Sequence, residues 1–280
     1  MKTFYSGGDK LSKELKNFYG DEINYSTIMK LFRKKDVKLN GKRVGGDIQT
    51  APHDLIEAYF DGTVRPIREI YKDENVLVVY KPDGISSEEF FAKIQGAYKA
   101  AAFIHRLDRN TDGIMIFALS PAAETELLKG FKDRTFDKYY LAEVFGTPKA
   151  DRATMTAYLK KDAEKALVKI SDKPAPSYEK IVTEYEVLKR TAETAVLKVK
   201  LVTGKTHQIR AHLAFLNLPI IGDGKYGNEK INRKFKAKTQ RLTAKSLTLH
   251  FDENSPLFYL DGKTFCCEEG VKRLIKTYNI

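Results

Sequence analysis

One short stretch of the chain concentrates polar side chains that could do chemistry. It precedes the apolar run IMIFAL and reads His105-Arg106-Leu107-Asp108-Arg109-Asn110-Thr111-Asp112-Gly113. Loops that lead into buried strands hold reactive groups rigidly while leaving them exposed. The charges of Arg106 and Arg109 favour the ionised form of Asp108, and an ionised carboxylate can act as a nucleophile. A salt-bridged turn would use the same residues, so this stretch alone leaves both interpretations open.

Two short runs of the sequence resemble motifs of other protein classes, and the sequence argues against both. Protein kinases have His-Arg-Asp, but Leu107 interrupts it here, and no glycine-rich loop precedes Lys81. The run Thr203-Gly204-Lys205-Thr206 suggests a phosphate-binding loop, but Val199 stands where the first glycine of that loop is required.

The histidines and cysteines do not have the spacing of metal ligands. His207 and His212 are five residues apart, whereas two zinc ligands on one helix face are four apart. The adjacent Cys266 and Cys267 form no Cys-x-x-Cys pair and are poorly placed for a structural disulfide. We therefore expect no bound metal and a reducing, cytoplasmic setting.

The chain after the first 70 residues alternates strands and helices that would position the loop. Apolar or alternating runs predict strands at ENVLVVYKP, IMIFAL, KYYLAEVFG and TAVLKVKLV. One helix is predicted to begin at Ser120-Pro121, and another covers HQIRAHLAFL. Their predicted inward residues are Leu127, Leu128 and Phe131, and Ile209, Leu213 and Leu216. Mixed strands with interspersed helices predict an α+β fold.

Residues 1–62 predict a small domain of their own, built from two helices and a hairpin. The inward residues of the helices recur at helical spacing, and the predicted sets are Leu11, Leu15 and Phe18, then Ile28, Leu31 and Phe32. Ser26 is the predicted cap of the second helix. Asn40-Gly41 between alternating residues predicts the hairpin, and LIEAYF predicts a closing strand. A linker at 63–69 would separate this domain from a second one at 70–280.

The chain is strongly basic, and its basic residues are clustered. The formal net charge is +12, which favours a polyanionic partner. Residues 30–43 hold seven basic residues and one acid, and residues 225–245 hold eight and one. Ordinary solvated lysines are the alternative interpretation, and the clustering shifts the balance toward a polyanionic partner. No apolar run of about 18 residues is present, so we expect no contact with a membrane.

Four successive stretches resemble the motifs of the RluA-type pseudouridine synthase family. They are IYKDENVLVVYKPDG at 70–84, HRLDRNTDG at 105–113, KYYLAEVFG at 138–146 and TGKTHQIRAHLAFLNLPIIGDGKYG at 203–227. The resemblance implies a catalytic domain with a mixed, largely antiparallel β-sheet and flanking helices. It also implies a monomeric enzyme without a cofactor, which isomerises uridines in structured RNA. Large-subunit ribosomal RNA is the expected substrate, and transfer RNA is the alternative.

The resemblance also implies a role for each residue that matches a motif. Asp108 matches the nucleophile, and Arg106 matches the arginine that helps to wedge the target nucleotide out of its helix. Tyr140, not Tyr139, matches the tyrosine that stacks on the base, and Arg210 matches the partner of the nucleophile. The residues implied to contact the substrate are His105, Arg106, Thr206, His207 and Ile209.

The first domain resembles the alpha-L RNA-binding domain, the type found in ribosomal protein S-four. The residues that this resemblance implies for RNA binding are Lys30, Arg33, Lys34, Lys35, Lys42 and Arg43. Where that domain usually ends in a Pro-Gly-Asp turn, this chain has Ala51-Pro52-His53-Asp54. A small helical cap with a solvated basic face is the alternative interpretation.

The catalytic part departs from the family pattern at two acids. Asp112 stands where the family usually has serine, and Asp83 where it usually has alanine; we expect Asp112 to cap or turn the loop. A non-catalytic RNA-binding protein of the same fold is the main rival hypothesis, and the set of Asp108, Tyr140 and Arg210 argues against it. A two-carboxylate glycosidase would need a second acid that the motifs do not supply.

Overall fold

The computed structural model describes residues 1–20, 23, 25–60, 67–162, 164 and 166–268. They form two compact units, divided after residue 66. Most of the linker predicted at 63–69 lies outside the described residues, and its last two positions already belong to strand β5, Arg68–Lys72.

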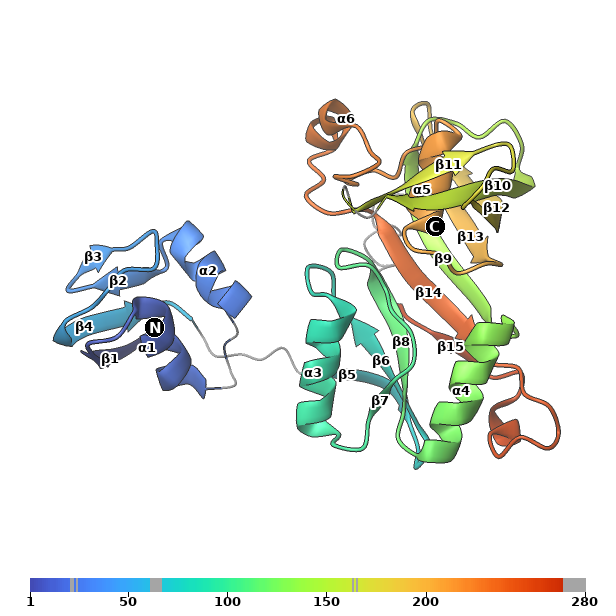
Figure 1. The fold of residues 1–280 in the computed structure, drawn as a ribbon. Coiled ribbons are helices and arrows are strands. Elements are labelled where there is room, and N and C mark those ends of the chain that lie inside the picture. The colour runs from blue at the N-terminus through green and yellow to red at the C-terminus, as the bar shows by residue number, and fades with distance from the viewer. Residues whose placement is uncertain (21–22, 24, 61–66, 163, 165, 269–280) are drawn as a thin grey trace. The chain divides into compact units, whose positions relative to one another are not determined.

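The first unit packs two helices against a four-stranded antiparallel sheet (Figure 1). Its elements are β1 Lys2–Gly7, α1 Leu11–Tyr19, α2 Tyr25–Lys34, β2 Val37–Leu39, β3 Lys42–Arg43 and β4 Pro52–Ala58. The sheet order is β1-β4-β2-β3. The predicted hairpin is present between β2 and β3, where Asn40 and Gly41 have φ angles of 49° and 77°. Two successive positive φ angles are what a tight hairpin turn requires. Strand β1 was not predicted.

This unit differs from the prediction at one core position and at one helix cap. Leu11, Leu15, Ile28 and Phe32 are buried together as expected. Phe18, however, is 43% exposed and stacks on Phe4. Its neighbour Tyr19 is buried in the core instead. Helix α2 begins at Tyr25, so Ser26 lies inside the first turn and does not cap it.

The second unit is built on one large sheet. Its strands are β5, β6 Val76–Lys81, β7 Ala102–Phe103, β8 Asp112–Ala118, β9 Asp137–Phe145, β10 Arg152–Asp162, β11 Leu167–Ser171, β12 Glu179–Arg190, β13 Thr194–Leu201, β14 Leu242–Thr248 and β15 Thr264–Cys266. The order is β11-β10-β12-β13-β9-β14-β8-β6-β5, with β7 on β8 and β15 on β14. The pair β14–β8 is parallel and the other pairs are antiparallel. The fold is therefore α+β with a mixed, largely antiparallel sheet, as predicted.

Helices cover both faces of β6 and β8, which explains why these strands are apolar throughout. Helix α3, Ser87–Ala97, packs through Phe90 and Ile94 on the face of Leu77 and Phe117. Helix α4, Pro121–Asp133, packs on the other face, against Val76, Val78, Ile114 and Ile116. Figure 1 shows the two helices on either side of these strands. Ser120 caps α4 as predicted, by accepting a hydrogen bond from the Ala123 N–H.

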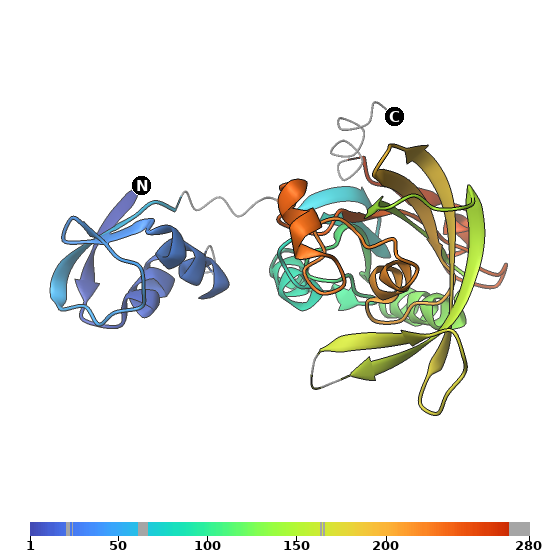
Figure 2. The same cartoon turned by 90° about the horizontal axis from the view of Figure 1, so that it is seen from above.

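The other half of the sheet carries helix α5, Gln208–Phe215, which packs through Ile209 and Leu213 on strands β9 and β13. Two residues predicted to face inward are exposed instead, namely Leu128 at 43% and Leu216 at 36%. Strands β10, β11 and β12 were not predicted, and in Figure 2 the β10–β11 hairpin extends away from the body of the sheet. The remaining helical segments are α6, Glu229–Lys234, and η2, Phe258–Leu260. In the part of the chain that the structure describes, no helix has the length and apolar character needed to cross a membrane.

Strands β8 and β14 lie close together at Gly113. This residue pairs with Ala244 and has a φ angle of 125°. A β-carbon built at Gly113 would lie 2.3 Å from the carbonyl oxygen of Ala244. Both the backbone angle and the contact therefore require glycine, directly after the loop that carries Asp108.

Gly113→Ala should destabilise the second unit by about 3 kcal/mol or more, because it combines a strained φ angle with a backbone collision. Urea unfolding followed by circular dichroism would measure this change. Gly96→Ala is the control, since the added methyl group meets nothing within 4 Å in helix α3. That substitution should be neutral or stabilise the protein by up to about 1 kcal/mol. Equal stability of the two variants would contradict the packing described for β8 and β14.

Candidate active site

The loop that carries Asp108 is fixed from beneath by buried groups. Leu107 packs into the core below the loop, so its neighbours Arg106 and Asp108 face outward. The Ser87 hydroxyl donates to the carbonyl of Leu107 and accepts from its N–H, both at 2.8 Å. The loop therefore has little freedom at the residue next to Asp108.

Lys81 fixes the same loop from the end of β6. Its ammonium group is fully buried and donates to the carbonyls of Pro82 and Ile85 at 2.9 Å and of Arg109 at 3.3 Å. Burial lowers the pKa of Lys81 to about 8, because an ammonium group loses hydration in the interior. The lysine thus has a structural role here.

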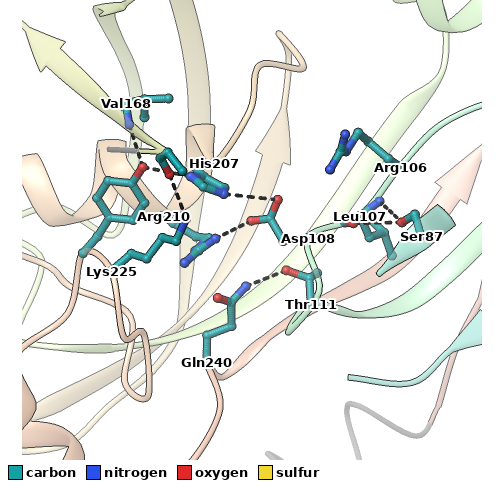
Figure 3. A network of polar contacts seen from close by, with 12 residues as sticks. Ser87, Arg106, Leu107, Asp108, Thr111, Val168, His207, Arg210, Lys225 and Gln240 are labelled. Atoms are coloured by element: carbon teal, nitrogen blue, oxygen red, sulfur yellow. Dashed lines mark hydrogen bonds and ion pairs between the residues drawn. The ribbon is translucent and has the colours of Figure 1, made fainter. Parts of the chain in front are cut away.

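Arg210 lies between two carboxylates, as Figure 3 shows for its contact with Asp108. One terminal nitrogen donates to Asp108 Oδ2 at 2.7 Å. The Nε and the other terminal nitrogen donate to the two oxygens of Asp223 at 2.7 and 2.9 Å. A two-point contact of this kind fixes the plane of a guanidinium group. The guanidinium group of Arg210 is therefore held in one orientation, with one terminal nitrogen directed at Asp108.

Asp223 is completely buried and holds this geometry. Burial alone would raise the pKa of its carboxyl group. The hydrogen bonds and charge of Arg210, with the backbone N–H groups of Lys225 and Tyr226, outweigh burial and hold the pKa below its usual range. The side-chain amide of Asn232 on α6 further ties the backbone on both sides of Asp223, through Gly222 N and Asp223 O.

A pocket of about 410 Å³ opens above this ion pair, in the size range of small-molecule sites. It brings together all eight residues that were predicted as catalytic or substrate-binding in the second domain. They are His105, Arg106, Asp108, Tyr140, Thr206, His207, Ile209 and Arg210. They come from the loop before β8, from strand β9, and from helix α5 with the loop before it.

Tyr140 and Ile209 form part of the pocket wall. Tyr140 lies on β9 between Val199 and Ala244, and burial, with the nearby charge of Asp108, raises the pKa of its hydroxyl group. No hydrogen bond to this hydroxyl group occurs among the described residues. The adjacent Tyr139 does not line the pocket; the ammonium groups of Lys198 and Lys200 lie over its ring.

His105 lines the pocket as a neutral ring that is already engaged. Its Nε2 accepts from the N–H of Ile116 at 3.1 Å, and the ring stacks on Phe131 at a centroid distance of 4.4 Å. Burial, with a smaller effect from Lys138, lowers its pKa to about 3. Arg106 has an exposed side chain with an ion pair to Glu88 at 3.2 Å, and Thr206 is also exposed.

Asp112 does not cap or turn the loop, and this expectation was wrong. It is the first residue of β8, and its buried carboxylate accepts from the hydroxyl of Tyr80 at 2.7 Å and of Thr243 at 2.6 Å. It therefore joins β6 and β14 and does not line the pocket. Asp83, the other departure, accepts from the Thr239 hydroxyl at 2.9 Å.

Several residues around the pocket were not singled out from the sequence. Asp223 and Tyr226 lie in the run GDGKYG, at the end of the motif at 203–227, where an acid between two glycines was a signal. Lys132, Arg134 and Lys138 line the pocket from the end of α4 and from β9. Among the described residues, no group of three or more His, Cys, Asp or Glu side chains could hold a metal ion.

Comparison with known proteins identifies the class to which this fold and pocket belong. A family model described as RNA pseudouridylate synthase matches residues 75–215, which is half of the chain. The chain therefore belongs to the RNA pseudouridine synthases, which are isomerases, and its relatives are of the RluA type.

Two curated relatives illustrate the match. Ribosomal large subunit pseudouridine synthase C of Vibrio cholerae is 28% identical over 273 residues, which cover 86% of this chain and 84% of the relative. Dual-specificity RNA pseudouridine synthase RluA of Escherichia coli is 34% identical over 174 residues, which cover 57% of this chain and 76% of that protein.

Solved structures show the same fold. Human RNA pseudouridylate synthase domain containing 1 matches with a TM-score of 0.60 at 22% identity, over 78% of this chain and 96% of that one. Human RNA pseudouridylate synthase domain containing 4 matches with a TM-score of 0.58 at 22% identity, over 74% and 92%.

Asp223→Asn should destabilise the protein by about 3–5 kcal/mol, because it leaves the buried Arg210 without its two-point partner. The full difference in stability from the parent should be seen above about pH 5. It should become smaller below about pH 4, since a carboxyl group with a lowered pKa stabilises the fold only while it is ionised. Urea unfolding at several pH values would measure both effects.

Asp252→Asn is the matched control, because Asp252 forms an exposed ion pair with Lys129 at 3.7 Å. Such a pair contributes at most about 1 kcal/mol. If the two variants were equally stable at neutral pH, Asp223 would not be the support of Arg210 that its geometry indicates.

Proposed function

We propose that this chain converts specific uridines to pseudouridine in structured RNA, with large-subunit ribosomal RNA as the substrate and Asp108 as the nucleophile. The observation that supports this most directly is the ion pair of Asp108 with Arg210 at 2.7 Å on the pocket wall. One carboxylate oxygen is occupied by the arginine. The other faces the pocket, where the sugar of a bound nucleotide would present its C1′ atom.

The pocket walls suit a base that has left its helix. A base inside a duplex is out of reach, so the target uridine must be extruded into the site. Tyr140 offers the ring on which the uracil would stack, and Ile209 offers an apolar contact beside it. Arg106, exposed at the rim, would fill the gap that the extruded nucleotide leaves. We infer that Asp108, Tyr140 and Arg210 carry the reaction.

The charge of the pocket supports RNA as the ligand. Among the described residues that line it, Asp108 is the single acid, and the cations are Arg106, Lys132, Arg134, Lys138, Lys205 and Arg210. Lys138 is partly buried, and burial with the nearby charge of Arg134 lowers its pKa. Three of these cations form ion pairs, Arg106 with Glu88, Lys205 with Glu179 and Arg210 with Asp108 and Asp223. The excess of positive charge around the concave site would still attract phosphates. The names of the relatives favour ribosomal RNA within this class.

The first unit is proposed to be an alpha-L RNA-binding domain at residues 1–62, joined by the linker at 63–69 to the catalytic domain at 70–280. Its two helices, hairpin and basic α2 terminus support this assignment. The six proposed RNA contacts, Lys30, Arg33, Lys34, Lys35, Lys42 and Arg43, are all exposed. Within the described residues, none of the six forms an ion pair with an acid.

Asp108→Asn should abolish isomerisation while leaving RNA affinity and folding nearly unchanged, because it removes the nucleophile and keeps its shape. Release of tritium from RNA labelled at uridine C5 would measure turnover, and filter binding would measure affinity. Asp172→Asn, at an exposed acid away from the pocket, is the control and should keep full activity. Residual turnover within about tenfold of the parent would mean that another group is the nucleophile.

Replacing Lys30, Arg33 and Lys34 by Gln in the full chain should weaken RNA binding and flatten its salt dependence. Each phosphate contact that is lost should reduce the log–log slope by roughly 0.7 to 0.9. Activity on a short RNA should persist, because the catalytic residues remain. Replacing Lys149, Lys173 and Lys263 by Gln is the charge-matched control. An unchanged slope in the first variant would make the unit a cap or a protein-docking module.

A further inference from the structure

His207 is held at the edge of the pocket by an unusual backbone. It precedes helix α5 with a φ angle of 53°, a left-handed conformation that costs a non-glycine residue energy and often occurs at functional sites. Its side chain is 14% exposed, and its two ring nitrogens meet different groups. Nδ1 lies 2.9 Å from the Tyr226 hydroxyl, and Nε2 points toward Asp108 Oδ1 at 3.9 Å (Figure 3).

The partners of Tyr226 determine which nitrogen of His207 carries the proton. The backbone N–H of Val168, on β11, donates to the Tyr226 oxygen at 2.8 Å. The hydroxyl proton then needs an acceptor, and His207 Nδ1 is the only one within hydrogen-bond distance among the described residues. If Nδ1 carried the proton instead, the hydroxyl proton would have no acceptor among the residues that the structure describes. This arrangement favours the neutral tautomer of His207 in which Nδ1 accepts from Tyr226 and Nε2, on the pocket side, carries the proton.

The separation of Nε2 from Asp108 is also informative. At 3.9 Å the two groups do not hydrogen-bond, yet both line the pocket. The Nε2–H donor is left for a third group that lies beside the carboxylate. In a pseudouridine synthase that group is the uracil of the extruded nucleotide.

We propose that His207 is a catalytic hydrogen-bond donor, whose Nε2–H binds a carbonyl oxygen of the uracil while the base is detached, and that Tyr226 is the positioning residue that fixes its tautomer. The proposal rests on the function proposed above and deepens it. It assigns to this site a means of stabilising the detached base, which Asp108 and Arg210 do not provide.

The balance of the reaction shows why a donor is needed. When the bond between N1 and C1′ breaks, its electron pair stays on the uracil, and C1′ bonds to an oxygen of Asp108. The negative charge spreads over the two carbonyl oxygens of the base. C5 then bonds to C1′, the Asp108 carboxylate leaves, C5 loses its proton and N1 gains one. A neutral donor stabilises the uracil anion without giving up its own proton.

The surrounding charges favour the neutral ring. Burial lowers the pKa of His207, and so do the charges of Arg210 and Lys225, whereas Asp108 and Asp223 act in the opposite direction. The result is a pKa below the usual value for histidine, which leaves the ring uncharged at neutral pH. A protonated ring would instead pair with Asp108 and occupy the nucleophile. The hydrogen bond that Tyr226 donates to the neutral ring adds to this preference.

Four variants test the proposal in single-turnover reactions at saturating RNA. His207→Ala should lower the rate by about 100-fold or more, the usual effect of losing a donor to developing charge. His207→Gln keeps an N–H group and should recover part of that loss. Tyr226→Phe should lower the rate by about fivefold, as expected for one hydrogen bond. Tyr71→Phe, which loses a hydroxyl contact to Asp73 elsewhere, should have the parental rate.

The pH profile separates positioning from simple loosening. Without the Tyr226 hydroxyl the pKa of His207 should rise, because the neutral ring loses a bond, so the acid limb of the Tyr226→Phe profile should move to higher pH. Nitrogen-15 NMR of the parent should show His207 protonated at Nε2 and bare at Nδ1, with the signal assigned by its loss in His207→Gln.

Either of two results would overturn the proposal: an Nδ1-protonated His207 in the parent, or parental rates in His207→Ala. A lower rate in Tyr226→Phe with an unmoved acid limb would also contradict the positioning role. Failure of the proposed function is distinguishable, because the parent protein would then release no tritium at all.

Discussion

The guanidinium group of Arg210 is the interaction on which the rest of the site depends. It is buried between two carboxylates, and only the two-point contact with Asp223 makes its orientation unique. Burying these charges without such contacts would be strongly unfavourable. Much of the surrounding backbone serves this arrangement. The GDGKYG turn supplies Asp223 and is itself held by Asn232 on α6, while helix α5 fixes the height of Arg210 above the sheet. Of the three charged groups, Asp108 is the one that remains open to a ligand, because its second oxygen faces the pocket.

Local patterns predicted the central part of the fold well, for a physical reason. Strands β6 and β8 have both faces covered by helices, so they read as uninterrupted apolar runs. Ser120 and Pro121 predicted the start of helix α4, and Asn40 and Gly41 predicted the β2–β3 hairpin. The strands β10, β11 and β12 lack this signal, because one face of each is exposed or half-buried and the buried positions include small or polar residues such as Ala157 and Thr183. Leu128 and Leu216 were misplaced because helical spacing alone does not give the width of the buried stripe.

The residues of the site also fall into those that the sequence predicted and those that it did not. Eight of the residues that line the pocket were found through whole motifs, and no local rule would have joined Asp108 to Arg210 across the sheet. Asp223, Tyr226 and Lys81 were missed as partners because their contacts are set by tertiary structure. Tyr226 depends on a single N–H of β11, and Lys81 on three carbonyl groups from two loops. Such groups act through hydrogen bonds to the backbone, which leave no periodic trace in a sequence.

The buried carboxylate of Asp112 restricts how this chain could change over evolutionary time. Its two oxygens accept one hydroxyl proton each, from Tyr80 on β6 and Thr243 on β14. The shorter side chain of a serine could not reach both, so Asp112→Ser alone would leave one of these hydroxyl groups without an acceptor. A change at Tyr80 or Thr243 alone would leave the carboxylate short of a donor. The three positions are therefore epistatic, and a mutational path through them should need paired substitutions.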